Sequence, residues 1–143
     1  MNYQHTQTGF LILWTLLFVV LLFIGLLVFI GIYESIFIML FIIFLIISFV
    51  SLTVTIDEKD LRIQFGYGIY KKRFDLQDIT SARTVKNKWY YGWGIHIWFW
   101  PYMLIFNVSG FDAVEIKLKS GKKIRIGTDE PEKLEQAIRQ SIN

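Results

Sequence analysis

The sequence predicts a membrane α-helical hairpin followed by a small, mainly β domain that ends in one helix. Between Asn2 and Ile56 the one formally charged side chain is Glu34, and most of the other residues are apolar. From Leu52 onward apolar residues recur at every second position, which is the period of a half-buried strand. The final residues return to helical spacing. What remains beyond the membrane segment is enough for one small domain.

Two apolar runs form the predicted hairpin, at about residues 10–30 and 36–54. At about 1.5 Å per residue the first run spans about 31 Å, close to the hydrocarbon thickness of a bilayer. The connection between the runs is so short that the two helices must run antiparallel. A cleaved signal peptide is the alternative for the first run. Residues 1–9, predicted to be an N-terminal tail, hold no Lys or Arg and lead into a long run, which favours the anchor.

The distribution of charge predicts the orientation of this hairpin. All 15 Lys and Arg residues follow it, the first being Lys59. Because basic flanks resist translocation, we expect a multi-pass protein with both termini in the cytoplasm and Glu34 at the outer tip. Ionisable groups inside a membrane mark transport pathways, and the two runs offer only hydroxyl groups such as Thr15 and Ser48. The hairpin is interpreted as an anchor, and a small channel or transport component built on it is the alternative.

Seven short strands are predicted after the hairpin, each with alternating apolar residues between turn-forming segments. They cover residues 52–56, 61–65, 69–74, 79–85, 104–108, 113–118 and 124–126. A C-terminal helix follows, with Pro131 near its first turn, Asp129 and Glu132 spaced as a capping box, and an apolar stripe after them. For residues 52–143 the expected architecture is a small antiparallel barrel capped by the helix, because closure removes sheet edges from solvent.

Several stretches of the domain resemble those of bacterial two-helix membrane proteins with a C-terminal pleckstrin-homology-like (PH-like) domain. They are LTVTIDEKDLRIQFG, FDLQDI and AVEIKLKSGKKIRIGTDEPEKLEQAI, with the motifs Asp78-Ile79, Gly92-Trp93-Gly94-Ile95 and Gly127-Thr128-Asp129-Glu130-Pro131. The resemblance covers about residues 52–142, and a helical hairpin is its usual companion. It implies a split barrel of about seven strands with a capping helix, at the cytoplasmic face of a bacterial inner membrane, in a binding or scaffolding role without catalysis.

One loop departs from the phosphoinositide-binding members of that fold, which carry basic residues in and beside the first strand-to-strand loop. Here the loop is Asp57-Glu58-Lys59-Asp60, which is net acidic. Phosphoinositide recognition at this loop is therefore not expected.

An aromatic run between Trp89 and Tyr102 holds four of the five tryptophans. Trp and Tyr concentrate at the depth of lipid headgroups, where the ring and its polar edge both find partners. We expect this run to contact the membrane or a partner; the alternative is that its rings fill the core of a small barrel. The expected contact residues are Trp89, Tyr90, Tyr91, Trp93, Trp98, Phe99, Trp100 and Tyr102.

Basic residues form further clusters outside the hairpin. A membrane-facing or simply solvated face is the interpretation, because the modest net charge of +3 does not favour nucleic acid as a partner. Near an anionic surface each such residue contributes about 1 kcal/mol of attraction. The expected basic surface comprises Lys71, Lys72, Arg73, Lys86, Lys88, Lys122 and Lys123.

Catalysis and cofactors are not expected from this sequence. It contains no Cys, and its two histidines, His5 and His96, lie far apart in the chain without a nearby cluster of ligands, so no metal or cofactor is predicted. The leading prediction is a membrane-anchored module that binds a membrane-protein partner or a second copy of itself, in contact with membrane lipids. Direct binding of anionic lipid by the domain is the first alternative.

Overall fold

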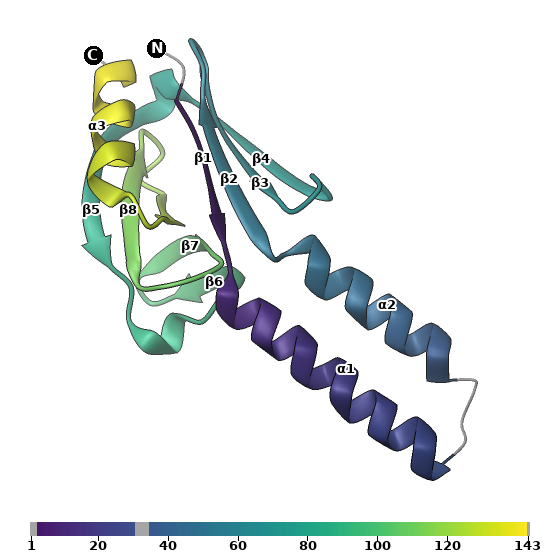
Figure 1. Cartoon of the computed structure of the whole chain (residues 1–143). Helices are drawn as coiled ribbons and strands as arrows, with labels where there is room; N and C mark the ends of the chain where they lie inside the picture. The colour runs from purple at the N-terminus through teal and green to yellow at the C-terminus, as the bar shows by residue number, and fades with distance from the viewer. Residues whose placement is uncertain (1–2, 31–34, 143) are drawn as a thin grey trace.

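The computed structural model describes residues 3–30 and 35–142 (Figure 1). An N-terminal apolar helix and a mainly β body with a C-terminal helix are confirmed. The chain begins with strand β1 (Tyr3–Thr8), continues through helices α1 (Phe10–Ile30) and α2 (Ser35–Ser48), and returns in strand β2 (Ser51–Ile56). The remaining elements are β3 (Asp60–Phe65), β4 (Tyr70–Asp75), η1 (Leu76–Asp78), β5 (Ile79–Lys86), η2 (Trp89–Tyr91), β6 (Gly94–Phe99), β7 (Tyr102–Asn107), β8 (Asp112–Leu118), β9 (Lys123–Gly127) and α3 (Pro131–Ile142).

Residues 1–9 were predicted to be a tail, but residues 3–8 of this segment form β1. This strand pairs antiparallel with β2, from Tyr3 opposite Ile56 to Thr8 opposite Ser51. Its side chains are mostly polar, so it lacks the apolar alternation that identified the other strands. Its inner face meets the start of α3, where His5 Nε2 lies 2.5 Å from Asp129 Oδ1.

This contact also changes the start of the last helix. Asp129 was expected to cap α3, but the helix begins at Pro131 and the Asp129 carboxylate bonds to His5 instead. The Thr128 hydroxyl accepts a hydrogen bond from the Glu130 N–H at 3.1 Å. Burial, together with Glu130 and Asp129, raises the pKa of Tyr3 to about 12. The N-terminal strand therefore contacts the segment that leads into the C-terminal helix.

The second helix ends at Ser48, six residues before the predicted boundary at residue 54, and β2 begins at Ser51. Leu52, Val54 and Ile56 alternate into the core of the domain with at most 3% of their surfaces exposed. Pairing with β1 on one side and β3 on the other satisfies the backbone of this segment. Pairing on both sides of β2 therefore ends the helix although the apolar run continues beyond Ser48. The predicted tip at Glu34 lies outside the described residues.

Two sheets make up the domain, with strand orders β1-β2-β3-β4 and β5-β8-β9-β7-β6. The aromatic run contributes one strand that was not predicted, β6. With β1, the described residues form nine strands in place of the expected seven. The pairing of β7 with β9 is parallel, which departs from the expected antiparallel barrel. No barrel closes: among the described residues no strand of one sheet pairs with a strand of the other.

The side chains on β4 account for the open barrel. Lys71, Lys72 and Arg73 are all exposed on this edge strand. Lys72 lies on the same face of β4 as Tyr70 and Phe74. The rings of these two residues pack on Phe106 of β7 at centroid distances of 6.0 Å and 6.5 Å. A charged side chain that points inward on an edge strand opposes the addition of a further strand. The sheets therefore contact each other through Tyr70 and Phe74 and remain unpaired beside Lys72.

One hydrophobic core lies between the two sheets and α3. Leu134, Ala137 and Ile138 of α3 are buried in it, which confirms the predicted apolar stripe. On its polar side, Glu135 accepts hydrogen bonds from the backbone N–H and the hydroxyl of Thr84 in β5, at 2.6 Å and 2.7 Å. The helix thereby covers the outer edge of β5.

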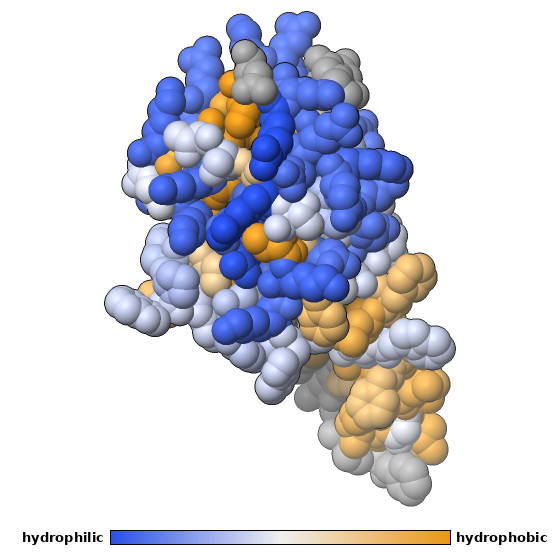
Figure 2. Space-filling view, turned by 90° about the vertical axis from the view of Figure 1, so that its left-hand side faces the viewer, coloured by the Kyte–Doolittle hydropathy of each residue, from blue (hydrophilic) through white to orange (hydrophobic). Residues whose placement is uncertain are grey.

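The two helices leave the domain together (Figure 1). Within the described residues one helix is long and apolar enough to cross a bilayer: residues 10–28 of α1 have a mean hydropathy of 3.1, and none of this segment is buried. Helix α2 is also apolar but has 14 residues, or about 21 Å. Figure 2 shows the contrast between the mostly hydrophilic surface over α3 and β5 and the hydrophobic helices below it.

The junction between helices and domain depends on backbone contacts. The Gly9 N–H donates to the Val50 carbonyl at 2.7 Å, and the Gly66 N–H donates to the Ser51 carbonyl at 2.9 Å. Gly66 has a φ of +49°, and a Cβ atom there would lie 2.3 Å from the carbonyl oxygen of Ser48. The β3–β4 turn therefore fits directly against the end of α2.

Replacement of Gly66 tests this junction. We expect Gly66→Ala to lower the free energy of unfolding by about 1–2 kcal/mol because of its left-handed backbone. Displacing the Ser48 carbonyl should lower it by about 1–3 kcal/mol more. Gly110→Ala is the matched control, because Gly110 has a φ of +68° and open space around its Cβ position. Thermal unfolding of the full chain in detergent measures both variants. Equal losses of stability in the two variants would contradict the contact.

Candidate functional site

The aromatic run lies largely outside the hydrophobic core. Trp89 in η2 is 77% exposed, and Phe99 and Trp100 at the β6–β7 turn are 80% and 90% exposed. Tyr90 and Tyr102 are also exposed, Trp93 and Trp98 are half-buried, and only Tyr91 among the expected contact residues is buried. We call these eight residues the aromatic layer. Large exposed rings gathered on one side of a domain are characteristic of an interaction surface.

A small hydrophobic cluster, separate from the main core, holds the aromatic layer on the outer face of the second sheet. Tyr91 packs with Met103 and Ile105, and its ring centroid is 4.9 Å from that of Trp98. Tyr90 stands edge-on to Tyr91 at 5.1 Å. Edge-to-face contacts of this kind add stability beyond the area that they bury. The layer is therefore a defined structure that presents its outermost rings to the surroundings.

A buried carboxylate supports this cluster from the sheet. Glu115 accepts hydrogen bonds from Arg83 Nη2 at 2.6 Å and from Arg125 Nε at 2.9 Å, and the Arg125 guanidinium lies 5.5 Å from the Tyr91 ring centre. Burial by itself would raise the pKa of Glu115. The hydrogen bonds and charges of the two arginines outweigh burial and hold the pKa of this carboxyl below its ordinary value.

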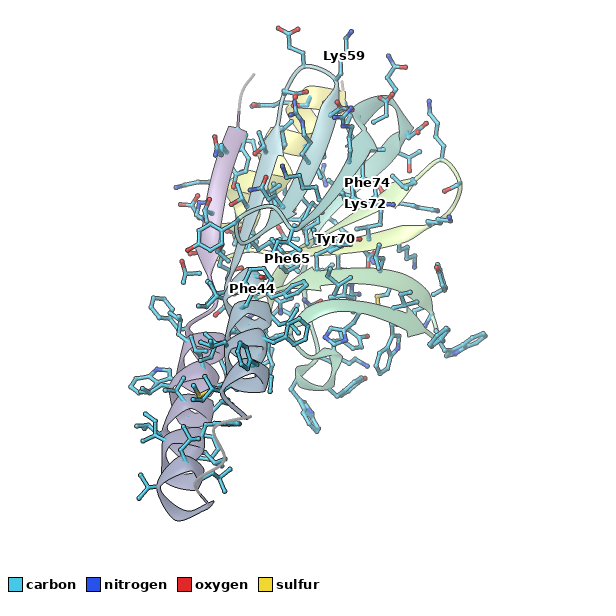
Figure 3. All side chains as sticks on the ribbon, turned by 90° about the vertical axis from the view of Figure 1, so that its right-hand side faces the viewer. Phe44, Lys59, Phe65, Tyr70, Lys72 and Phe74 are labelled. Atoms are coloured by element: carbon cyan, nitrogen blue, oxygen red, sulfur yellow. The ribbon has the colours of Figure 1, made fainter. Side chains whose placement is uncertain are left out.

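The aromatic layer lies on the same side of the domain as the helices. Trp93 and Gly94 share a shallow hollow with Ile12, Leu45 and Phe49 of the α1–α2 root. In Figure 1, β6 lies at the lower end of the domain, beside the point where β1 passes into α1. In Figure 3, Lys59 in the β2–β3 loop lies at the opposite end. The layer thus faces whatever surrounds the start of the helices.

The expected basic residues fall into separate groups. Lys86 and Lys88 flank the aromatic layer; the Lys88 ammonium lies 5.5 Å from the Tyr90 ring centre, and Lys86 is 3.9 Å from Asp112. Lys71 projects from β4 toward the turn at Gly68. The structure brings the other four, Lys72, Arg73, Lys122 and Lys123, around one cleft.

This cleft, of about 590 Å³, occupies the open side of the barrel between β4 and the inner face of the second sheet. Its apolar lining comes from five strands and comprises Phe74, Ile95, Ile97, Leu104, Leu118 and Ile124. Tyr70 and Tyr102 stand at its sides, and Asp75 and Asp78 contribute two acidic groups. Apart from Tyr102, these uncharged and acidic lining residues carry no local sequence signal of a site, because the cleft exists only where the two sheets fail to join.

The described residues include no group of three or more His, Asp or Glu side chains placed to hold a metal ion. The two histidines have structural partners: His5 contacts Asp129, and His96 Nε2 lies 2.5 Å from the Trp93 carbonyl oxygen. Comparison of the chain with models of protein families, with curated proteins and with solved structures finds no match. Function is therefore inferred from the aromatic layer and the cleft.

The Glu115 interactions predict a specific dependence of stability on pH. A depressed pKa means that the ionised carboxylate stabilises the fold above its ordinary value of 4.5, and that this contribution is lost as pH falls through the folded-state pKa. At pH 7 we expect Glu115→Gln to lower the free energy of unfolding by about 2 kcal/mol. The deficit should shrink below pH 4.5.

Thermal unfolding of the full chain in detergent across this pH range measures the effect. Glu58→Gln, in the exposed β2–β3 loop, serves as the control and should follow the unmodified protein at every pH. A deficit in Glu115→Gln that does not change with pH would contradict the role of the charge.

Proposed function

We propose that this chain is a non-catalytic binding module, anchored in the cytoplasmic membrane of a bacterium and holding its mainly β domain against the cytoplasmic face. The observation that carries this proposal is the direct pairing of β1 with β2 beside the helix root. A chain that leaves the sheet along α1 must return to the neighbouring strand through α2. The domain therefore has two short connections to the helices and little freedom to move away from them.

The two-helix anchor is supported by the character of the helices. Helix α1 exposes Phe10, Trp14 and Phe18 on a surface that only lipid or another apolar surface would cover. The Thr15 hydroxyl donates to the Leu11 carbonyl and the Ser48 hydroxyl to the Phe44 carbonyl. These polar groups are satisfied within their own helices, which favours an anchor over a transport pathway. We propose that α2 and its connection complete the return crossing.

The PH-like assignment is part of this proposal. Two packed sheets followed by a C-terminal helix that closes one end of the core agree with such a domain. The N-terminal strand before the helices and the parallel β7–β9 pair are additions to the expected pattern. In this arrangement the helical hairpin is an insertion between two adjacent strands of the domain.

The aromatic layer is proposed to rest at the headgroup level of the membrane. It faces the helix side, its Trp and Tyr rings are amphipathic, and Lys86 and Lys88 precede it in the chain. A membrane-protein partner is the second candidate for this surface. The observation that favours a partner is the protruding β6–β7 turn, where Phe99 and Trp100 are the most exposed rings of the layer.

Tryptophan quenching distinguishes these occupants. The full chain is reconstituted in vesicles with Trp89 as its single tryptophan, the other four being replaced by Phe, and with lipids brominated near the headgroup. We expect strong quenching of Trp89. In the control, Trp89 is also replaced by Phe and Lys59→Trp places the fluorophore at the far end of the domain, where quenching should be minimal.

Equal, weak quenching of both probes would overturn the membrane contact. A protein that co-purifies with the chain from its native membranes, and is lost on Trp100→Ser, would assign the layer to the second candidate.

A further inference from the structure

The open cleft has the composition of a site for an amphipathic ligand. Its volume of about 590 Å³ lies within the range of small-molecule sites, which are mostly apolar with a few polar groups. Ile97 is 52% exposed, and Ile95, Leu104 and Leu118 are half-buried although they face inward between the sheets. Apolar side chains that line a cleft without being covered indicate that something apolar completes their burial.

The charged groups around this apolar lining favour an anion. Four basic and two acidic residues border the cleft. Arg73 is partly balanced by Asp60, with 3.6 Å between Nε and Oδ2. Among the described residues no carboxylate lies within 4.0 Å of the Lys72 or Lys122 ammonium. Figure 3 shows Lys72 between Tyr70 and Phe74 along β4. An anionic group beside Lys72 and Lys122 would meet two cations and keep its apolar part on the lining.

The cleft also reaches the edge of the domain nearest the membrane. Ile95 and Ile97 belong to β6, the edge strand of the second sheet and part of the layer beside the helix root. From β6 the cleft crosses β7 and β9 to Leu118 of β8. Strands in a sheet lie about 4.8 Å apart, so this path is about 14 Å long. A lipid could therefore enter at β6 without first passing through water.

We propose that the cleft binds an anionic lipid of the membrane, with its headgroup between Lys72 and Lys122 and part of an acyl chain on the apolar lining. This inference deepens the proposed function, on which it rests, by naming the ligand class of the domain. The site differs from the β2–β3 loop, whose residues Asp57 to Asp60 are net acidic and lie elsewhere.

Photo-crosslinking of the full chain in lipid nanodiscs tests the proposal. The probe is phosphatidylglycerol with a diazirine on one acyl chain, present in trace amounts, and phosphatidylcholine with the same chains is the zwitterionic comparison. Irradiation should attach phosphatidylglycerol to β6, β7 and β9 at the cleft, as mapped by mass spectrometry. The yield from phosphatidylcholine should be several-fold lower, because it carries no net charge.

Two double variants with equal loss of charge separate the cleft from the general surface. Lys72→Gln with Lys122→Gln should lower the phosphatidylglycerol yield at the cleft by on the order of tenfold. Lys71→Gln with Lys119→Gln is the matched control, because these residues lie one and three positions from Lys72 and Lys122 but do not line the cleft. Its yield should stay unchanged.

Equal decreases in the two double variants, or equal yields from the two lipids, would overturn the proposal. Adducts on the helices and η2 without any at the cleft would also overturn it while leaving the membrane contact intact. Adducts on the helices alone would remove the proposed membrane contact as well. A polypeptide that co-purifies with the full chain, and is lost in Lys72→Gln with Lys122→Gln, would assign the cleft to a protein instead.

Discussion

The backbone pairing of β1 with β2 is the constraint on which the rest of this structure depends. These strands are separated in sequence by the whole helical hairpin, yet they are neighbours along their full length. The Gly9 N–H and the Val50 carbonyl extend the contact to the start of the helices. A domain attached by one flexible linker could rotate freely above a membrane. A domain into which the hairpin is inserted has one face directed toward the helices, and that face carries the aromatic layer.

The contact between β1 and the segment before α3 extends this constraint across the domain. His5 reaches Asp129, so the first strand is bound to the segment before the last helix as well as to β2. Helix α3 in turn covers the β5 edge through Glu135 and the core through Leu134. Forces on the helices are therefore carried by both sheets. This arrangement compensates for the thin core that a domain of this size can build.

An open barrel leaves apolar side chains exposed in its gap, which lowers stability unless a ligand covers them. Closing the gap would require β4 to pair with the second sheet, and the inward Lys72 opposes this. Lys72 lies on the face of β4 that carries Tyr70 and Phe74, and it borders half-buried apolar side chains of the cleft. The lysine is better explained by a counter-charge outside the protein, which is the role given to the lipid headgroup.

Sequence patterns predicted the elements whose periodicity is strong. The alternation at Leu52, Val54 and Ile56 and the stripe on α3 gave strands and a helix where the structure has them. β1 was missed because its side chains are polar and its strand character comes from its partner. The end of α2 was placed too late because an apolar strand continuing an apolar helix leaves no composition boundary. The aromatic layer was predictable because its rings are close together in the sequence. The cleft forms only when β4 and β9 come together in the fold, and no local sequence pattern specifies that contact.

Disulfide formation between β1 and β2 tests the central claim most directly. Thr6 and Thr53 are opposed, with their hydroxyl oxygens 2.9 Å apart, and the chain contains no cysteine of its own. Opposed residues in a strand pair have Cα atoms about 4.5–5.5 Å apart, within the range that a disulfide spans. In isolated membranes under mild oxidation, Thr6→Cys with Thr53→Cys should form an intramolecular disulfide rapidly. Gln4→Cys with Thr53→Cys, two positions out of register, should form little; equal reaction of both pairs, or of neither, would contradict the pairing.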